Sequence, residues 1–208
     1  MIIAIDGPAG SGKGTIAKRL GALFGLPVLD TGALYRATAL SLTRAGADPA
    51  DAMLAAQHAR ALDDAILADP DLRSAKIGAL ASQVAAHGSV RAALVDWQRA
   101  FAAQPGGAIL DGRDIGTVIE PHAPVKLFVT ASLDARTERR ALDLEARGEG
   151  VDRAKLRADL ADRDRRDTER RDAPMKRAPD AVLLDTTELS IDAAVDQAIA
   201  VVETAWNA

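Results

Sequence analysis

The chain opens with a short apolar run that passes directly into a glycine-rich loop and a lysine. Residues 1–15 read MIIAIDGPAGSGKGT, in which Gly7, Gly12 and Lys13 have the spacing G-x-x-x-x-G-K of a phosphate-binding loop. Glycines let consecutive backbone N–H groups converge on an anion, because no Cβ blocks the approach. A helix is predicted to follow, whose first N–H groups favour negative charge, and Lys13 adds a point charge. Strand, loop and helix together favour a phosphate site over an ordinary glycine-rich turn.

Strand and helix signals alternate along the rest of the chain, which indicates an α/β fold with a parallel sheet. Most predicted strands are short apolar runs that end in Asp or Thr, as is typical where the carboxyl ends of buried strands meet a ligand. The predicted strands are Ile2–Asp6, Pro27–Asp30, Ala108–Asp111, Val125–Val129 and Ala181–Asp185. The predicted helices are Gly14–Phe24, Gly32–Ala45, Ala50–Leu67, Leu72–Ala86, Ser89–Ala103, Leu133–Arg147, Arg153–Arg171 and Ile191–Trp206.

Composition excludes several classes of protein. The chain has 208 residues and no cysteine, which predicts one globular unit without disulfides or thiol chemistry and fits a reducing cytoplasm. We expect neither a signal peptide nor a membrane span, because the N-terminus lacks a basic region and no apolar run is long enough. A net charge of −4 argues against nucleic acid as the main partner. His58, His87 and His122 lie far apart in the sequence and form no metal-ligand pattern.

Two further strand ends carry candidate site residues. Thr31 follows the second predicted strand and is expected to cap the next helix, and Arg36 on that helix is placed to reach a phosphate. The third predicted strand ends at Asp111, the usual place for a carboxylate that holds Mg²⁺ through water, and Arg113 follows it near the same phosphates. The alternative is a tight turn that uses Asp and Gly for their conformations.

The densest charge run, residues 162–171, reads DRDRRDTERR. As one helix it would place Arg163, Arg166 or Asp167, and Arg170 on a single face. Like charges on that stripe would repel one another unless phosphates lay between them. The alternative is a solvated face crossed by ion pairs.

A smaller basic pair precedes that run. Arg136 and Arg140 are neighbours on the predicted helix and are placed to flank a donor triphosphate, or else to pair with Glu138 and Asp143.

Missing motifs narrow the chemistry further. Asn207 is the only asparagine, so the guanine-recognition motif N-K-x-D is absent, which argues against a GTPase. The protein-kinase motif H-R-D-x-x-x-x-N is absent as well. No dedicated general base is apparent. That suits an acceptor whose attacking atom is already an anionic phosphate oxygen, whereas a sugar or shikimate kinase must activate a hydroxyl.

Motifs in the same order along nearly the whole chain resemble those of the bacterial cytidylate kinases. They read GPAGSGKGT, DTGALYR, SQVAA then SVR, QRAF, DGRDIGTV, APVKLF, RDRRDTER and VLLDTTELSID. The resemblance implies an α/β phosphate-binding-loop fold of three layers, with a five-stranded parallel core sheet, a helical acceptor-binding insert and an arginine-rich lid. The core would span about residues 1–34, 105–144 and 178–208, the insert about 35–104, and the lid about 145–177. The implied reaction transfers a phosphoryl group from ATP to CMP or dCMP, with Mg²⁺.

Site residues follow by matching motif positions to that family. The implied ATP site comprises the loop residues Gly7, Pro8, Ala9, Gly10, Ser11, Gly12, Lys13, Gly14 and Thr15, with Arg136 and Arg140. The implied cytidylate site comprises Thr31, Tyr35, Arg36, Ser82, Arg91, Arg113, Asp114, Arg163, Asp167 and Arg170. Ser82, Arg91 and Asp114 would read the base, Arg36, Arg113 and Arg170 would hold the acceptor phosphate, and Arg163 with Asp167 the sugar. Lys13, Arg113, Arg163 and Arg170 would be catalytic, and Asp111 would hold Mg²⁺ through water.

Two departures from the family pattern stand out. Thr31 replaces a frequent serine and retains the hydroxyl, and residues 68–71 replace a small β-hairpin. The family expectation is a cytoplasmic monomer that uses neither nucleic acid nor membrane as a partner. Two other functions remain open. One is a kinase with a different acceptor, such as UMP, AMP or a small metabolite. The other is a regulator that binds ATP only to switch a partner surface.

Overall fold

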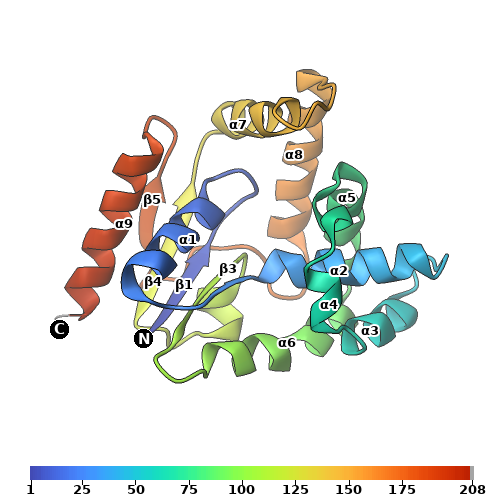
Figure 1. Cartoon of the computed structure of the whole chain (residues 1–208), viewed down its shortest axis with the longest axis horizontal. Helices are drawn as coiled ribbons and strands as arrows, with labels where there is room; N and C mark the ends of the chain where they lie inside the picture. The colour runs from blue at the N-terminus through green and yellow to red at the C-terminus, as the bar shows by residue number, and fades with distance from the viewer. Residues whose placement is uncertain (207–208) are drawn as a thin grey trace. The chain divides into compact units, whose positions relative to one another are not determined.

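The computed structural model describes residues 1–206 and divides them into two compact units (Figure 1). The first unit comprises Met1–Val28 and the chain from Pro105 onward, and the second comprises Leu29–Gln104. Among residues 1–206, every helix is too short or too polar to cross a membrane.

The first unit contains four strands of a parallel sheet, and the fifth begins at Val28, the last residue of that unit before the second unit. Within the described residues the sheet has five strands in the order β2-β3-β1-β4-β5, so the strand that precedes the glycine-rich loop is the central one. β1 pairs in parallel with β3 and β4, and β4 pairs in parallel with β5. The strands span Ile2–Asp6 (β1), Val28–Asp30 (β2), Ala108–Gly112 (β3), Val125–Thr130 (β4) and Val182–Asp185 (β5). The predicted fold class and the five predicted strands are confirmed, with ends that move by one residue.

Apolar side chains of β1, β3 and β4 form a core with two helices. Ile16, Ala17 and Leu20 of α1 (Lys13–Phe24) and the buried face of α9 (Ile191–Trp206) pack in one cluster with the odd-numbered residues of β1. Both helices carry their apolar residues at helical spacing, so one stripe of each is buried on the sheet.

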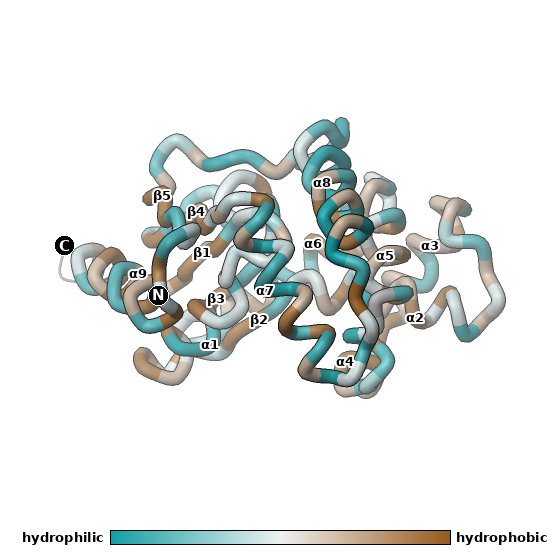
Figure 2. Tube along the Cα trace, turned by 90° about the horizontal axis from the view of Figure 1, so that it is seen from above, coloured by the Kyte–Doolittle hydropathy of each residue, from teal (hydrophilic) through white to brown (hydrophobic). Residues whose placement is uncertain are grey.

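Two more helices of the first unit contain the basic residues of interest. α7 (Leu133–Glu145) packs against α8 (Arg153–Glu169), whose tube in Figure 2 is largely hydrophilic. A short π-helical turn, η2 (Ile115–Ile119), follows β3 and packs on β1 and β3.

The second unit is helical. Its core is formed by Leu34, Leu42, Val84, Val90 and Leu94, all at most 1% exposed. Its elements are α2 (Thr31–Arg44), α3 (Ala52–Arg60), α4 (Asp64–Leu67), η1 (Pro70–Arg73), α5 (Ala75–Val84) and α6 (Gly88–Ala102).

Two predicted helices of this unit are each broken in two. The prediction of one helix over Ala50–Leu67 is wrong, because Asp63 caps a new helix by accepting a hydrogen bond from the backbone N–H of Ile66. The predicted helix Leu72–Ala86 begins instead as the 3₁₀ turn η1. Ser74 then caps α5 by accepting from the backbone N–H of Ile77. Short side chains that bond the backbone locally therefore overrode an uninterrupted helical pattern.

Candidate active site

The glycine-rich loop connects the central strand to α1. A Cβ on Gly7 would collide with the carbonyl group of Val129 on β4, so the close approach of loop and strand requires glycine. Gly12 is the N-cap of α1 with φ of 92°, a left-handed conformation that glycine adopts at little cost. The loop therefore presents the N-terminal N–H groups of α1 beyond the carboxyl end of the sheet, where an anion is favoured.

Two side chains of the loop are buried with it. Lys13 is 6% exposed, and its Nζ donates to the carbonyl oxygen of Pro8 at 3.0 Å, so the ammonium group lies over the loop. Ser11 is fully buried, and its Oγ has no hydrogen-bond partner in the structure. A buried hydroxyl without a partner costs free energy, which is a reason to expect a polar ligand there.

Asp111 lies on β3 beside this loop. It pairs in register with Ile5 of β1 and is buried, and a Cβ placed on Gly14 would lie 3.3 Å from its Oδ2. Among the described side chains, no group of three or more His, Cys, Asp or Glu residues could hold a metal. One carboxylate beside a phosphate loop fits Mg²⁺, which typically takes one or two protein carboxylates, with phosphates and water as its other ligands.

A second polar cluster joins the segment after β3 to the end of α8. Arg113 Nε donates to Asp167 Oδ2 at 2.9 Å, and Arg170 Nη2 lies 3.4 Å from Asp114 Oδ1. Burial raises the pKa of Asp167, but Arg113, Arg163 and Arg170 outweigh it and hold that pKa below its usual value. The side chains of Asp114, Asp167 and Arg170 are each less than one tenth exposed. Cations thus surround a buried carboxylate beyond the carboxyl end of β3.

This cluster decides between the two alternatives for the charge run. A solvated face is wrong for Asp167 and Arg170, whose side chains are 8% and 6% exposed, whereas Arg165 is 63% exposed and pairs with Asp162. The prediction that Arg170 continues the helix is also wrong, because α8 ends at Glu169. The chain turns there, and Arg170 Nε donates to the carbonyl oxygen of Ala173 at 2.7 Å. Ala173 has φ of 50°, which is uncommon for a residue other than glycine.

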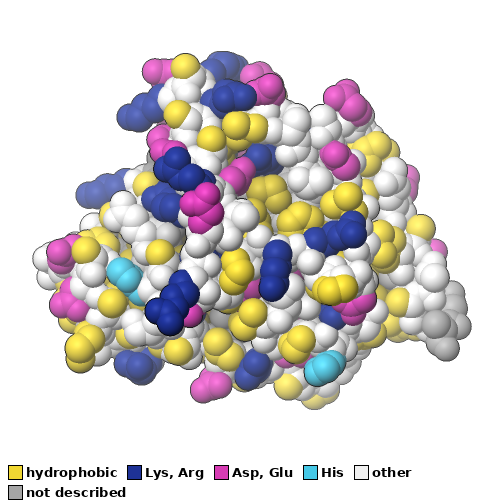
Figure 3. All heavy atoms as spheres, turned by 180° about the vertical axis from the view of Figure 1, so that it is seen from behind, with side chains coloured by type: hydrophobic (Ala, Val, Ile, Leu, Met, Phe, Trp, Pro, Cys, Tyr) yellow, Lys and Arg dark blue, Asp and Glu magenta, His cyan; other side chains and the backbone are white. Residues whose placement is uncertain are grey.

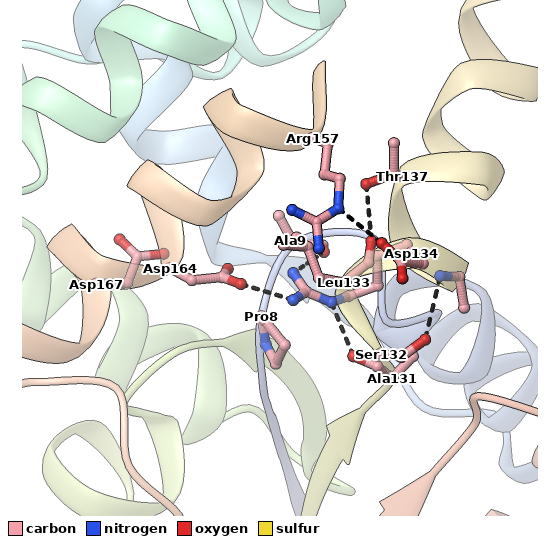
Figure 4. Close-up of polar contacts among 12 residues, drawn as sticks. Pro8, Ala9, Ala131, Ser132, Leu133, Asp134, Thr137, Arg157, Asp164 and Asp167 are labelled. Atoms are coloured by element: carbon pink, nitrogen blue, oxygen red, sulfur yellow. Dashed lines mark hydrogen bonds and ion pairs between the residues drawn. The ribbon is translucent and has the colours of Figure 1, made fainter. Parts of the chain in front are cut away.

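Arg136 bonds both the glycine-rich loop and α8. Figure 4 labels its partners on the two elements, Ala9 of the loop and Asp164 of α8. Its Nε donates to the carbonyl oxygen of Ala131 at 2.9 Å, Nη1 donates to that of Ala9 at 3.2 Å, and Nη2 pairs with Asp164 at 2.7 Å. The side chain of Arg136 is 6% exposed. Arg136 therefore ties the loop to α8, in place of the pairing with Glu138 that the sequence left open, and Glu138 pairs with Arg153. Arg140 lies one turn further along α7 and is partly buried.

Five of the predicted cytidylate residues lie in the second unit. Thr31 is the first residue of α2 and its N-cap is Asp30, so the expectation that Thr31 caps the helix is wrong. Asp30 Oδ2 forms an ion pair with Arg36 Nη2 at 2.7 Å. The Asp30 side chain makes no capping hydrogen bond to the N–H groups of α2. Tyr35, on the same helix, is covered by the Arg91 guanidinium, 5.6 Å from the ring centroid.

Ser82 completes the set in this unit. It lies on α5, is 4% exposed, and its Oγ has no hydrogen-bond partner in the structure. Arg91 on α6 is 6% exposed. Thr31, Tyr35, Ser82 and Arg91 are thus all buried polar or aromatic groups, which is unusual for residues without a role in binding or fold.

Sequence reasoning missed four polar residues that support the loop and the cluster. Thr186 Oγ1 donates to the carbonyl oxygen of Ser11 at 3.0 Å, and Arg139 Nη1 donates to Thr186 Oγ1 at 2.9 Å. Asp164 holds Arg136, and Asp6 bonds the backbone after Asp114. Three of them carried a signal in the sequence: Asp6 ends an apolar strand, Arg139 lies beside Arg136 and Arg140, and Asp164 lies in the charge run. Thr186 carried none.

A central parallel strand that ends in this loop, with buried arginines around a carboxylate in the same unit, defines a phosphotransferase of the phosphate-binding-loop class. The family model described as cytidylate kinase matches residues 3–204. The chain belongs to the cytidylate kinase family and is thus an ATP-dependent nucleoside monophosphate kinase.

Curated relatives match along almost their whole length. The chain is 58% identical over 207 residues to a cytidylate kinase of Methylocella silvestris, covering 100% of this chain and 96% of the relative. It is 56% identical over 203 residues to a cytidylate kinase of Rhodopseudomonas palustris, and the match covers 98% of this chain and 96% of that relative. A crystal structure of an uncharacterized protein from Eubacterium ventriosum shares the fold, with a TM-score of 0.55, 16% identity and coverage of 98% and 99%.

Proposed function

We propose that this chain transfers the γ-phosphoryl group of ATP to CMP or dCMP, giving ADP and CDP or dCDP, and so serves pyrimidine nucleotide metabolism. The observation that carries the proposal is the buried Arg113–Asp167–Arg170 cluster, present in the same unit as the phosphate-binding loop. A protein that binds ATP only as a switch needs the loop alone. Further buried arginines indicate a second anionic substrate.

The loop and Lys13 bind the donor phosphates. Backbone N–H groups at the start of α1 receive the β-phosphate, and Lys13 exchanges the Pro8 carbonyl for oxygens of the transferring group. The charge moves toward the leaving oxygen as the phosphoryl group departs, and a preorganised ammonium group stabilises that state more than the ground state.

The acceptor phosphate supplies the attacking oxygen and needs no base to activate it. Arg113 and Arg170 hold that phosphate, and Asp167, which both arginines contact, keeps them in place and orients the sugar together with Arg163. Arg36 would add a further charge to the acceptor phosphate, and its guanidinium group pairs with Asp30.

Cytosine is read by complementary groups. Its exocyclic amino group donates hydrogen bonds, and its ring nitrogen and carbonyl oxygen accept them. Asp114 offers a carboxylate to the amino group, and Ser82 and Arg91 offer donors to the acceptors. The buried Ser82 hydroxyl that lacks a partner supports this assignment, because a nucleobase would supply one. Thr31 and Tyr35, both buried in the second unit, belong to the proposed acceptor set as well.

Mg²⁺ belongs to the proposal as the ion that accompanies ATP. Asp111 would hold it through water, given the place of that carboxylate against Gly14. When bound, the ion would supply positive charge that neutralises charge on the donor phosphates.

The remaining parts of the proposal concern mobility and partners. Residues 35–104 act as a moving insert and residues 145–177 as a lid. The enzyme acts as a cytoplasmic monomer without nucleic acid or membrane. On the face drawn in Figure 3, Lys and Arg side chains are interspersed with Asp and Glu, so this face offers no uniformly basic surface to nucleic acid.

A substrate panel tests the function. With ATP and Mg²⁺, we expect turnover of CMP and dCMP, weak turnover of UMP, and almost none of AMP, GMP or shikimate. Lys13→Ala, prepared in parallel, shows that the activity belongs to this chain and not to a contaminant. Turnover of AMP as fast as CMP would make the acceptor assignment wrong, and ATP binding without any acceptor turnover would favour the regulator.

A further inference from the structure

Asp6 is a buried carboxylate that the proposed chemistry does not use. It is the last residue of the central strand and comes directly before Gly7 of the phosphate-binding loop. Only 5% of the residue is exposed. Its two oxygens do not bond the loop. Oδ1 accepts from the backbone N–H of Ile115 and Oδ2 from that of Gly116, both at 2.8 Å.

The two N–H groups belong to the segment that carries the acceptor-site residues Arg113 and Asp114. That segment is short and turns sharply, because the Asp114 carbonyl oxygen accepts from the backbone N–H groups of both Val118 and Ile119 as η2 begins. The cluster of Arg113, Asp114, Asp167 and Arg170 thus rests on backbone that Asp6 fixes at the next two residues.

Lys126 of β4 closes the other side of this segment. A Cβ on Gly116 would lie 3.2 Å from Lys126 Cδ and 3.5 Å from Asp6 Oδ2, so the backbone at Gly116 is packed between the lysine stem and the carboxylate. Lys126 Nζ itself bonds the Pro121 carbonyl oxygen and Asp180. A segment held on both sides leaves Asp114 little freedom to move.

The carboxylate occupies this place at a cost. Burial raises the pKa of Asp6 to about 6, although the N–H groups of Gly116 and Ile115 and the charge of Lys13 favour its ionised form. The charge of Asp114 raises it further. Above that pKa the folded state therefore carries a buried charge that a neutral side chain would avoid. Such a charge is expected where a function depends on it.

We propose that Asp6 is a positioning residue for the acceptor nucleotide, because its carboxylate holds the backbone of Ile115 and Gly116 and thereby sets the positions of Arg113 and Asp114. This inference rests on the proposed function. The competing view is that Asp6 supports the adjacent phosphate-binding loop. In that case its loss would weaken the binding of ATP instead of the binding of CMP.

Asp6→Asn separates the two views. Asn has the same size and keeps one carbonyl oxygen, but its amide N–H₂ group faces a backbone N–H and cannot accept from it. We expect the KM for CMP to rise about 10-fold or more, because a small misplacement of a binding group has large effects, while the KM for ATP changes less than about twofold. Equal rises in both KM values, or a rise for ATP alone, would overturn the proposal.

Ile5→Val is the matched control. Ile5 is fully buried next to Asp6 on β1, and its truncation lowers stability without altering the carboxylate. We expect both KM values to stay within about twofold of the wild type, because the change removes one methyl group from the apolar cluster of the sheet and leaves Asp6 unchanged. Wild-type turnover of CMP, measured in the same series, tests the proposed function separately. If the wild type turns over CMP but Asp6→Asn changes both KM values equally, the role proposed for Asp6 is wrong and the proposed function still holds.

A measurement on the wild type covers the case in which Asp6→Asn does not fold. The amide protons of Ile115 and Gly116 should exchange slowly with solvent, and their NMR shifts should change with pH as the Asp6 carboxyl group loses its proton. Fast exchange of both amide protons would overturn the hydrogen-bonded arrangement and the proposal with it.

Discussion

Arg170→Lys tests whether the buried cluster grips substrate through the shape of a guanidinium group as well as its charge. Arg170 Nε donates to the Ala173 carbonyl oxygen at 2.7 Å, Nη2 lies 3.4 Å from Asp114 Oδ1, and Nη1 lies 4.0 Å from Asp167 Oδ1. These three nitrogens lie in one plane and point in different directions within it. A lysine ammonium group is a single point and cannot reach all three oxygens and a phosphate at once.

The structure sets the size of the effect. Loss of at least one hydrogen bond to a charged group costs about 1.5–3 kcal/mol, which is a decrease in kcat/KM for CMP of about 10-fold to 150-fold. The melting temperature should also fall, because the side chain is 6% exposed and a buried carbonyl or carboxylate oxygen loses a donor.

Arg165→Lys is the control on the same helix. Arg165 is 63% exposed and its partner Asp162 is 59% exposed, so their ion pair contributes about 0–1 kcal/mol. Steady-state kinetics with CMP at saturating ATP, together with calorimetric melting of both variants, compare the two positions. If Arg170→Lys keeps kcat/KM within about threefold of Arg165→Lys, the cluster does not bind substrate in the proposed way.

Three further outcomes follow from the site. Lys13→Ala should lower kcat about 100-fold or more while the circular dichroism spectrum stays unchanged. A near-normal kcat would show that the loop takes no part in the reaction. Ala173→Val should lower kcat/KM about 10-fold, because a β-branched residue resists φ of 50° and the carbonyl that holds Arg170 would turn away. Ala173→Gly, which accepts that φ, is its control. Asp6 should make the wild type lose stability as pH rises from 4 to 6, since the folded carboxyl, with pKa about 6, holds its proton longer than the unfolded one at 3.8. That difference is about 3 kcal/mol, and denaturant unfolding of Asp6→Asn across this pH range should lack it.

Local signals in the sequence determined the elements of the fold with little help from tertiary structure. All five strands were predicted to within one residue, because each is a short apolar run bounded by a loop or a charged residue. The glycine-rich loop could also be predicted from the sequence, because its backbone conformation depends on glycines only a few residues apart. The helix breaks at Asp63 and Ser74 were missed, because each depends on a short side chain that competes with an otherwise continuous helical pattern.

The sequence also determined which residue types gather around phosphate, but it did not determine their partners. A dense run of arginines is compatible with a solvated face and with a binding site, and both occur here: Arg165 is exposed, and Arg170 is buried. Which of the two applies depends on contacts between residues more than fifty positions apart, such as Arg113 with Asp167.

Only the tertiary structure assigned the supporting residues. Asp6 lies 109 positions from Ile115 in the sequence, and Arg136 lies 127 positions from Ala9. Parallel strands place their carboxyl ends at one edge of the sheet, so loops that are remote in sequence meet there. No local pattern records which carboxylate will take which N–H group, because that choice depends on register, burial and the cost of leaving a buried polar group without a partner.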